Sequence, residues 1–203
     1  TGAIVRRQPF GGWKRSSVGS GTKPGGPDHL HSYGTWLPDT PRTGGAVSSN
    51  LQDSVIELAV VDYERAWAEY FTLEHDPTGL ACESNVLRYR PLDLVIARVP
   101  SADSDVVPFL RAAAMLTGTP LEISAADTES DEHLAARLSC MKGEVRLRVL
   151  TDTNDDVLRA AHTSGVTIDD SMVTGIGRLD LLRFVKEQAI SRTMHRYGRL
   201  IGN

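Results

Sequence analysis

Apolar runs alternate with amphipathic segments between residues 92 and 170, and this alternation constrains the fold more than any other feature. Four short apolar runs predict buried strands: LDLVIARV (residues 92–99), PLEISA (residues 120–125), VRLRVL (residues 145–150) and VTID (residues 166–169). The segments between them predict helices over residues 105–119, 130–143 and 154–165. Strands that alternate with helices through short connections are typical of an α/β layer. We therefore predict an α/β fold, an open, mostly parallel sheet with flanking helices.

Local signals define the ends of these helices. Ser130 is placed to cap the helix over residues 130–143, and acidic residues follow it in the first turn. Gly118 is a candidate C-cap of the helix before it, and Gly143 stands just past the end of the helix that Ser130 begins.

The regions on either side of this alternation differ from it. Residues 1–50 are rich in Gly, Pro, Ser and Thr and predict a loop-rich segment with few regular elements, whereas residues 54–73 predict an amphipathic helix. Residues 178–203 predict a long helix that is basic opposite one apolar stripe, made of Leu179, Leu182, Val185, Ala189, Ile190, Met194 and Tyr197. We predict three parts: residues 1–50, an α/β domain over residues 51–177, and a C-terminal helical motif over residues 178–203.

Charge and cysteine content limit the classes of protein to which this chain can belong. Residues 1–50 and residues 178–203 each carry a net charge of +4, and the acidic middle carries −12. The basic ends can dock on the middle or on an anionic ligand, or all these charges simply solvate the surface; the acidic middle argues against binding nucleic acid. Two distant cysteines, Cys82 and Cys140, form no disulfide framework and fit a reducing cytosol. No window approaches the roughly 20 apolar residues that a membrane helix needs.

The opening stretch, TGAIVRRQPFGGWKRSSVG, has the composition of a binding loop. The backbone N–H groups of Gly2 and Ala3 can approach an anion closely, because these residues have little or no side chain. Phe10 precedes two glycines that permit a tight turn. From the residues alone, a glycine-rich turn beside a core phenylalanine explains the stretch better than a binding site does.

A resemblance changes that balance. The run TGAIVRRQPFGGWKRSSVGSGTKPGGPDHL resembles pyrroline-5-carboxylate dehydrogenases of the aldehyde dehydrogenase superfamily, and within them the bifunctional proline utilization A family. The stretch from GLACESNVLRYR to PLEIS is similar to the nucleotide-binding half of aldehyde dehydrogenases, as in the extra C-terminal domain of longer family members. The tail, GRLDLLRFVKEQAISRTMHRYGRL, looks like the C-terminal motif of those members. The resemblance implies a C-terminal fragment, in which residues 1–50 are the end of a catalytic domain.

The resemblance also assigns roles. It implies that Gly2 and Ala3 bind the carboxylate of glutamate semialdehyde and that Phe10 packs against its methylene chain. The family often has Ser where Ala3 stands, so one hydroxyl donor is missing. The family's nucleophilic cysteine lies upstream of this motif, so we expect no catalytic residue in this chain. Cys82 and Cys140 are predicted to be buried small hydrophobic residues.

Two weak motifs predict no site. The glycines of GIG, Gly175 and Gly177, lack the third glycine of a dinucleotide fingerprint, because Asp180 occupies its place. His29 and His31 alternate in a loop, but no cysteine or carboxylate cluster supports a metal site, and we predict no metal.

The resemblance implies part of an NAD-dependent L-glutamate γ-semialdehyde dehydrogenase of proline catabolism, inactive alone. The fragment would supply the substrate-anchor loop and a non-catalytic domain that covers a tunnel. The alternative is a purely structural module with no ligand. NAD and, in an upstream proline dehydrogenase domain, FAD would serve the full-length protein, with neither bound to the fragment alone. The expected partners are the upstream domains and the semialdehyde, with no nucleic acid and with a homo-oligomer left open. The expected location is the cytoplasm, with a peripheral place at the inner membrane also open.

Overall fold

A computed structural model describes residues 9–10, 22–36 and 49–194 of the chain. Residues 1–8, 11–21, 37–48 and 195–203 lie outside this description.

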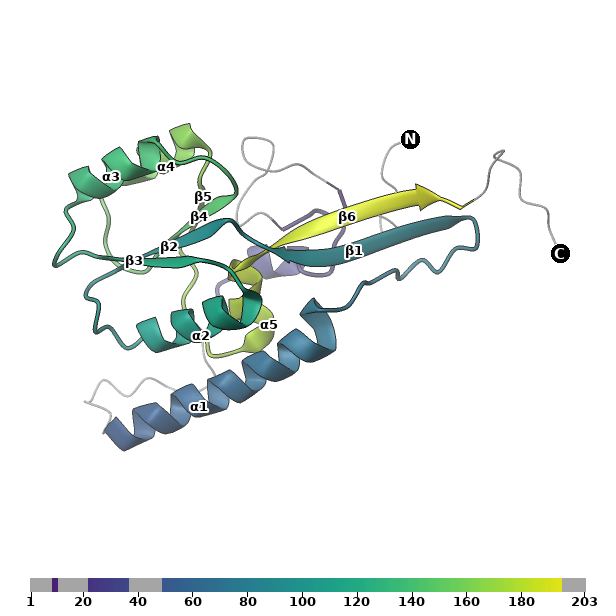
Figure 1. Cartoon of the computed structure of the whole chain (residues 1–203), viewed down its shortest axis with the longest axis horizontal. Coiled ribbons are helices and arrows are strands. Elements are labelled where there is room, and N and C mark those ends of the chain that lie inside the picture. The colour runs from purple at the N-terminus through teal and green to yellow at the C-terminus, as the bar shows by residue number, and fades with distance from the viewer. Residues whose placement is uncertain (1–8, 11–21, 37–48, 195–203) are drawn as a thin grey trace.

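Four parallel strands form the main sheet in the order β3-β2-β4-β5 (Figure 1). The strands are β2 (Leu94–Val99), β3 (Leu121–Ala125), β4 (Val145–Val149) and β5 (Thr167–Asp169). Val95 of β2 lies opposite Leu121 of β3, and Leu94 lies opposite Val145 of β4. The predicted α/β fold with a parallel sheet is confirmed, and each of the four predicted strands is present.

Helices cover both faces of this sheet, α2 on one face and α3 and α4 on the other (Figure 1). They are α2 (Val107–Thr117), α3 (Asp131–Ser139) and α4 (Asp155–Ser164). Val95, Ala97 and Val99 belong to the core beneath α2, whereas Ile96 belongs to the core beneath α3 and α4. Because side chains alternate across a strand, burial of both faces explains why β2 is an uninterrupted apolar run.

The helix ends follow the expected chemistry. The Ser130 side chain accepts a hydrogen bond from the backbone N–H of His133 at 3.3 Å, and Asn154 caps α4 in the same way through Val157 at 3.1 Å. Gly118 ends α2 with a φ of 70°, in the left-handed region that favours glycine. The predicted caps at Ser130 and Gly118 are therefore confirmed.

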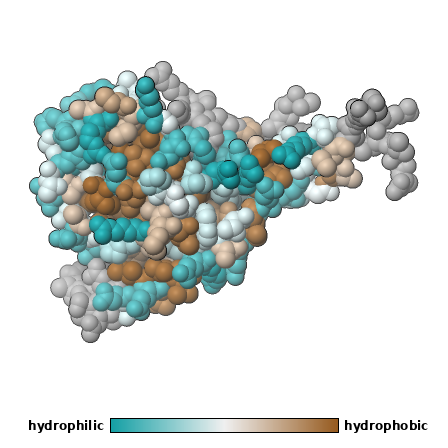
Figure 2. Space-filling model, viewed as in Figure 1, coloured by the Kyte–Doolittle hydropathy of each residue, from teal (hydrophilic) through white to brown (hydrophobic). Residues whose placement is uncertain are grey.

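The helix α1 (Ser49–Ala66) continues into a π-helical turn, η3 (Trp67–Phe71), which confirms the helix predicted over residues 54–73. It packs against α2 and α5 (Gly177–Asp180) through buried residues that include Tyr63 and Ala66. Figure 2 shows hydrophobic side chains among hydrophilic ones along α1. Val55, Leu58 and Val61 of this helix are exposed, so the described residues leave part of its apolar surface uncovered.

A two-stranded antiparallel ribbon projects from the body (Figure 1). It consists of β1 (Glu83–Pro91) and β6 (Val185–Thr193), with Pro91 opposite Val185 at its base and Glu83 opposite Thr193 at its far end. We call this pair the ribbon.

The long helix predicted over residues 178–203 is wrong. The chain forms only α5 and the 3-10 turn η4 (Leu181–Arg183) before it becomes β6. Leu181 and Phe184 enter the core, and beyond them the backbone pairs with β1. Pairing with a distant strand has overridden a helical pattern, as tertiary contacts often do. Tyr197, the last residue of the predicted stripe, lies outside the described residues, and the three-part division of the chain stays a prediction.

Candidate functional site

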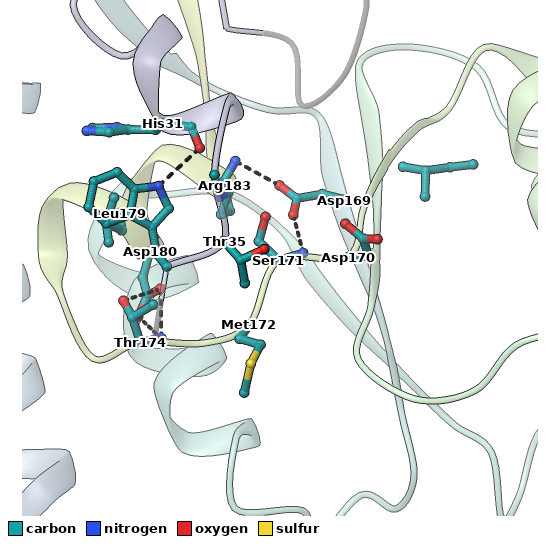
Figure 3. Close-up of a pocket in the computed structure, with 13 residues that line it drawn as sticks. His31, Thr35, Asp169, Asp170, Ser171, Met172, Thr174, Leu179, Asp180 and Arg183 are labelled. Carbon is teal, nitrogen blue, oxygen red and sulfur yellow. Dashed lines mark hydrogen bonds and ion pairs between the residues drawn. The ribbon is translucent and has the colours of Figure 1, made fainter. Parts of the chain in front are cut away.

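A cavity of about 440 Å³ lies where the carboxyl end of β5 meets the segment of residues 31–36 (Figure 3). The loop after β5 and the start of α5 complete its wall. Its lining is His31, Gly34, Thr35, Trp36, Ile168, Asp169, Asp170, Ser171, Met172, Thr174, Leu179, Asp180 and Arg183. We call this cavity the β5 pocket. Crevices at the carboxyl ends of parallel strands are the usual ligand sites of open α/β sheets.

Asp169, the last residue of β5, is the central charge of the β5 pocket. Its Oδ1 accepts a hydrogen bond from the backbone N–H of Ser171 at 2.9 Å. Its Oδ2 lies 3.2 Å from Nη1 of Arg183, and Nε of Arg148 lies 3.9 Å from Oδ1. Burial opposes ionisation of Asp169, but the two guanidinium groups outweigh it and hold its pKa below the usual value. The site therefore contains a buried carboxylate that stays ionised.

Arginines support this carboxylate from the neighbouring strand. Arg148 of β4 is fully buried and donates to the carbonyl of Ser171 at 2.6 Å, and Arg146 donates to the carbonyl of Leu182 at 3.0 Å. Burial lowers the pKa of Arg146 to about 10 and also lowers the pKa of Arg148, with neighbouring arginines acting in the same direction. Arg146 therefore remains a cation at neutral pH.

Asp180 forms another part of the wall and is saturated with donors. Its carboxylate accepts from the Tyr63 hydroxyl at 2.6 Å, from the Thr174 backbone N–H and hydroxyl, and from the Gly175 backbone N–H at 2.7 Å. This carboxylate therefore shapes the loop after β5 and is not free to bind a ligand directly.

Aromatic side chains close the opposite side of the pocket (Figure 3). Trp36 donates from Nε1 to the carbonyl of His31 at 3.1 Å, and the two rings meet edge to face at 5.4 Å. Burial lowers the pKa of His31 despite the nearby Asp28, so its imidazole is neutral at pH 7. The pocket thus has an uncharged aromatic side facing a charged side.

A second group of buried charges holds residues 22–36 against the ribbon. Asp28 is fully buried and accepts from the Tyr89 hydroxyl of β1 and from Arg178 at 3.1 Å. Glu187 of β6 accepts from the backbone N–H of Lys23 at 2.5 Å. Burial, and then the neighbouring carboxyl of Asp28, raise the pKa of Glu187 to about 8. We call Asp28 and Glu187 the carboxyl pair; Glu187 is protonated over much of the neutral range.

The topological switch point of the sheet lies between β2 and β4, and side chains of this chain fill it. Arg98 of β2 donates to Ser124 at 3.1 Å and to Asp131 at 2.5 Å. The other oxygen of Asp131 accepts from the backbone N–H of Asn154 at 3.0 Å, at the start of α4. A nucleotide phosphate placed at this point would meet a carboxylate and not a free helix N-terminus.

Of the predicted substrate-anchor residues, the structure describes only Phe10, which is not among the residues that line the β5 pocket. Gly2 and Ala3 lie outside the described residues. Phe10 is 43% exposed, and its backbone N–H donates to the carbonyl of Pro24 at 3.0 Å. Its neighbour Pro9 borders a separate hollow of about 590 Å³ beside Tyr70. The roles given to Gly2, Ala3 and Phe10 therefore stay predictions.

The structure also places the remaining candidates. Cys140 is exposed and Cys82 is partly buried, so the prediction that both are buried is wrong. Among the residues that the structure describes, no group of three or more His, Cys, Asp or Glu residues is arranged to hold a metal ion. Gly177 of the GIG motif packs against α1, where an added Cβ would lie 2.6 Å from the Cβ of Ala66. This glycine serves helix packing.

Sequence reasoning missed the charges that organise both sites. Arg146, Arg148 and Asp169 lie inside the apolar runs VRLRVL and VTID, where charged residues are expensive to bury. Their presence there was a signal that each has a buried partner, which is Leu182 for Arg146 and the ion pair between Arg148 and Asp169 for the other two. Asp28 and Glu187 gave no such signal, because only the fold brings them together.

The strand order and the helices on both faces place the domain in the doubly wound α/β class, extended by an antiparallel ribbon. Among solved structures, the chain is similar to proline utilization A from Corynebacterium freiburgense, with 36% sequence identity and a TM-score of 0.73. The match covers 98% of this chain and 20% of that chain, so this chain corresponds to about one fifth of the length of that protein. Over nearly its whole length, the chain is a homologue of a segment of proline utilization A.

Two further comparisons give nothing: no protein-family model and no curated protein matches the chain. Within the described part of the chain, no helix has both the length and the apolar character needed to cross a membrane.

Proposed function

We propose that this chain is part of an NAD-dependent L-glutamate γ-semialdehyde dehydrogenase of proline catabolism, which yields glutamate. The observation that carries the proposal is the 36% identity with a proline utilization A over 98% of the chain. NAD would serve the catalytic domain of the whole protein, and FAD would serve a proline dehydrogenase domain, in the cytoplasm.

Within such a protein, residues 51–177 and the ribbon form a non-catalytic domain. The switch point supports this assignment, because the Asp131 carboxylate bonds to the start of α4 and would repel a dinucleotide phosphate there. The acidic loops after the strands, which include Asp103, Asp127 and Asp170, would also repel a pyrophosphate. The same observations favour the second candidate, a structural module that binds no nucleotide and serves only to hold other domains.

Within this domain, the ribbon would be the part that covers the tunnel, since the helix expected over residues 178–203 does not form. It projects from the body, and at its far end Met194 is 64% exposed while its backbone N–H bonds to the carbonyl of Cys82 at 2.9 Å. An ordered strand end with an exposed apolar side chain is suited to contact another domain of the same polypeptide. That contact would close the path of the intermediate between two active sites.

Removal of residues 178–203 cannot test this idea, because Leu181, Leu182 and Phe184 belong to the core. Met194→Glu in the complete protein is the better change, with Met115→Glu as its control because Met115 is 83% exposed on α2. The measurements are NADH formation from added semialdehyde and NADH formation from proline. Met194→Glu should leave NADH formation from added semialdehyde nearly unchanged. NADH formation from proline should show a lag, and a trap for free pyrroline-5-carboxylate should lower its yield. If Met194→Glu and Met115→Glu behave alike, the ribbon does not cover the path.

A further inference from the structure

The charged side of the β5 pocket contains an acceptor that is ion-paired but accepts no hydrogen bond. Oδ2 of Asp169 is buried and, although Arg183 lies 3.2 Å away, it accepts no hydrogen bond. Behind it, Nε and Nη1 of the fully buried Arg148 also make no hydrogen bond. Buried polar groups without partners are costly, and an acceptor that lines a cavity is the place where a ligand donor gains most.

Charges of both signs meet at this side of the β5 pocket. Asp169 lies beside the exposed Asp170, and Arg183 lies across from Asp169 (Figure 3). A phosphate-bearing ligand would meet two carboxylates, and a simple cation would meet the guanidinium of Arg183. A molecule that carries an ammonium and a carboxylate on the same carbon atom matches both signs at once.

The other side of the β5 pocket fits an apolar group. Trp36, Met172 and Leu179 line it, and the hydrogen bond from Trp36 to His31 fixes the indole in place. Ligand sites commonly combine such an apolar wall with a few polar groups that fix orientation.

We propose that the β5 pocket binds a small zwitterion of the α-amino acid class. Its ammonium donates to Asp169 and Asp170, its carboxylate pairs with Arg183, and its side chain lies against Trp36 and Met172. This binding site is separate from the proposed dehydrogenase chemistry and does not rest on it. A bound ligand would join residues 31–36 to the loop after β5.

The test uses the 203-residue chain and the indole N–H resonance of Trp36, which is assigned from its loss in Trp36→Phe. The probes are L-leucine, L-proline and L-glutamate, together with 3-methylbutylamine and 4-methylpentanoate, which are leucine without its carboxylate and without its ammonium. We expect at least one amino acid to shift the resonance saturably. For leucine, each analogue should bind about tenfold more weakly or worse, a difference of about 1.4 kcal/mol. Inorganic phosphate should cause no saturable shift.

Two variants locate the site. Asp170→Asn removes an exposed carboxylate from the pocket, and Asp103→Asn removes another exposed carboxylate from the loop after β2. Asp170→Asn should weaken binding several-fold and Asp103→Asn should not, while both proteins unfold at the temperature of the original chain. The proposal is overturned if no amino acid binds below about 100 mM, if the leucine analogues bind as well as leucine, or if the two variants bind alike. If no amino acid binds, the β5 pocket is a water-filled cavity and not a binding site.

Discussion

The hydroxyl of Tyr63 donates to Oδ2 of Asp180 over 2.6 Å, and both side chains are almost fully buried. The bond joins α1 to the turn at α5, which are 117 positions apart in the sequence. The same carboxylate accepts from the backbone N–H groups of Thr174 and Gly175. Burial, followed by the charge of Asp180, raises the pKa of Tyr63 far above its usual value, so the phenol remains a donor at any pH the fold tolerates.

Tyr63→Phe should lower the free energy of unfolding by about 1–3 kcal/mol, because it leaves a buried carboxylate short of one donor. Chemical denaturation measures this change. Tyr33→Phe is the matched control: Tyr33 is 72% exposed and its hydroxyl bonds to His29, so loss of that hydroxyl should change the free energy of unfolding by no more than about 0.5 kcal/mol. Equal losses in the two variants would show that the Tyr63–Asp180 bond adds nothing to stability.

Gly177→Ala should also destabilise the domain. An added Cβ would lie 2.6 Å from the Cβ of Ala66 and 2.6 Å from the carbonyl oxygen of Asp62, so α1 and α5 must separate. Overpacking of this kind costs about 1–3 kcal/mol. Gly34→Ala has open space around the added Cβ and should be nearly neutral in the same denaturation experiment. A neutral Gly177→Ala would mean that the two helices can move apart freely.

The carboxyl pair should make stability fall as the pH rises. The pKa of Glu187 is raised to about 8 from a usual value of 4.5, mainly by burial and then by Asp28. Glu187 therefore holds its proton in the folded state while the unfolded chain has released it. Its contribution is complete below about pH 4.5 and is lost as the pH rises toward 8, with a slope of at most about 1.4 kcal/mol per pH unit.

Glu187→Gln tests this dependence, because glutamine keeps a polar group in place and cannot ionise. Unfolding measured between pH 5 and pH 8 should give a flatter profile for the variant than for the original chain. Glu132→Gln, on an exposed part of α3, should leave the profile unchanged. If Glu187→Gln does not flatten the pH dependence of unfolding, a group other than Glu187 takes up the proton in the folded state.

Phe10→Ala tests the substrate-anchor role in a complete dehydrogenase. Loss of an apolar contact should weaken use of glutamate semialdehyde by on the order of 1–3 kcal/mol and leave NAD affinity nearly unchanged. Steady-state kinetics with each substrate varied in turn measures the two effects. Tyr33→Ala removes an exposed aromatic ring from the same region and should alter neither. Equal losses for the semialdehyde and NAD would mean that Phe10 has only a structural role.

The 203-residue chain alone should produce no NADH from glutamate semialdehyde and NAD. Its two cysteines, the partly buried Cys82 and the exposed Cys140, lack the setting of the family's nucleophile. Absorbance at the NADH band measures the rate. Activity in the pure chain that disappears in Cys82→Ser would place the active site within this chain.

Much of the fold could be predicted from sequence patterns that act over a few neighbouring residues. The strand β2 and the helix cap at Ser130 were predictable because a run of apolar residues and a capping serine act over a few positions. The ribbon was not predictable in this way. Val185–Thr193 shows a helical stripe, and its partner Glu83–Pro91 lies about a hundred positions earlier. Only the assembled domain brings the two strands together.

The candidate site was even less accessible from the sequence. Asp169 and Arg183 lie on different elements, and Trp36 comes from a loop far upstream. Each residue alone is an ordinary surface or core residue, and their combined chemistry depends on distances that no spacing encodes. The anchor residues Gly2, Ala3 and Phe10 came from a motif instead, and the structure does not test them.

The ribbon encloses the α/β domain in the sequence, since Pro91 precedes the sheet and Val185 follows it. The intervening residues therefore act as one long loop between two paired strands. Closing so long a loop without prior structure is entropically unfavourable. We therefore expect β1 and β6 to pair late in folding, after formation of the sheet has brought Pro91 and Val185 close together. Protection of the ribbon amides against solvent exchange would then report that the enclosed domain is complete, and a defect deep in the sheet would first become visible at the ribbon's tip.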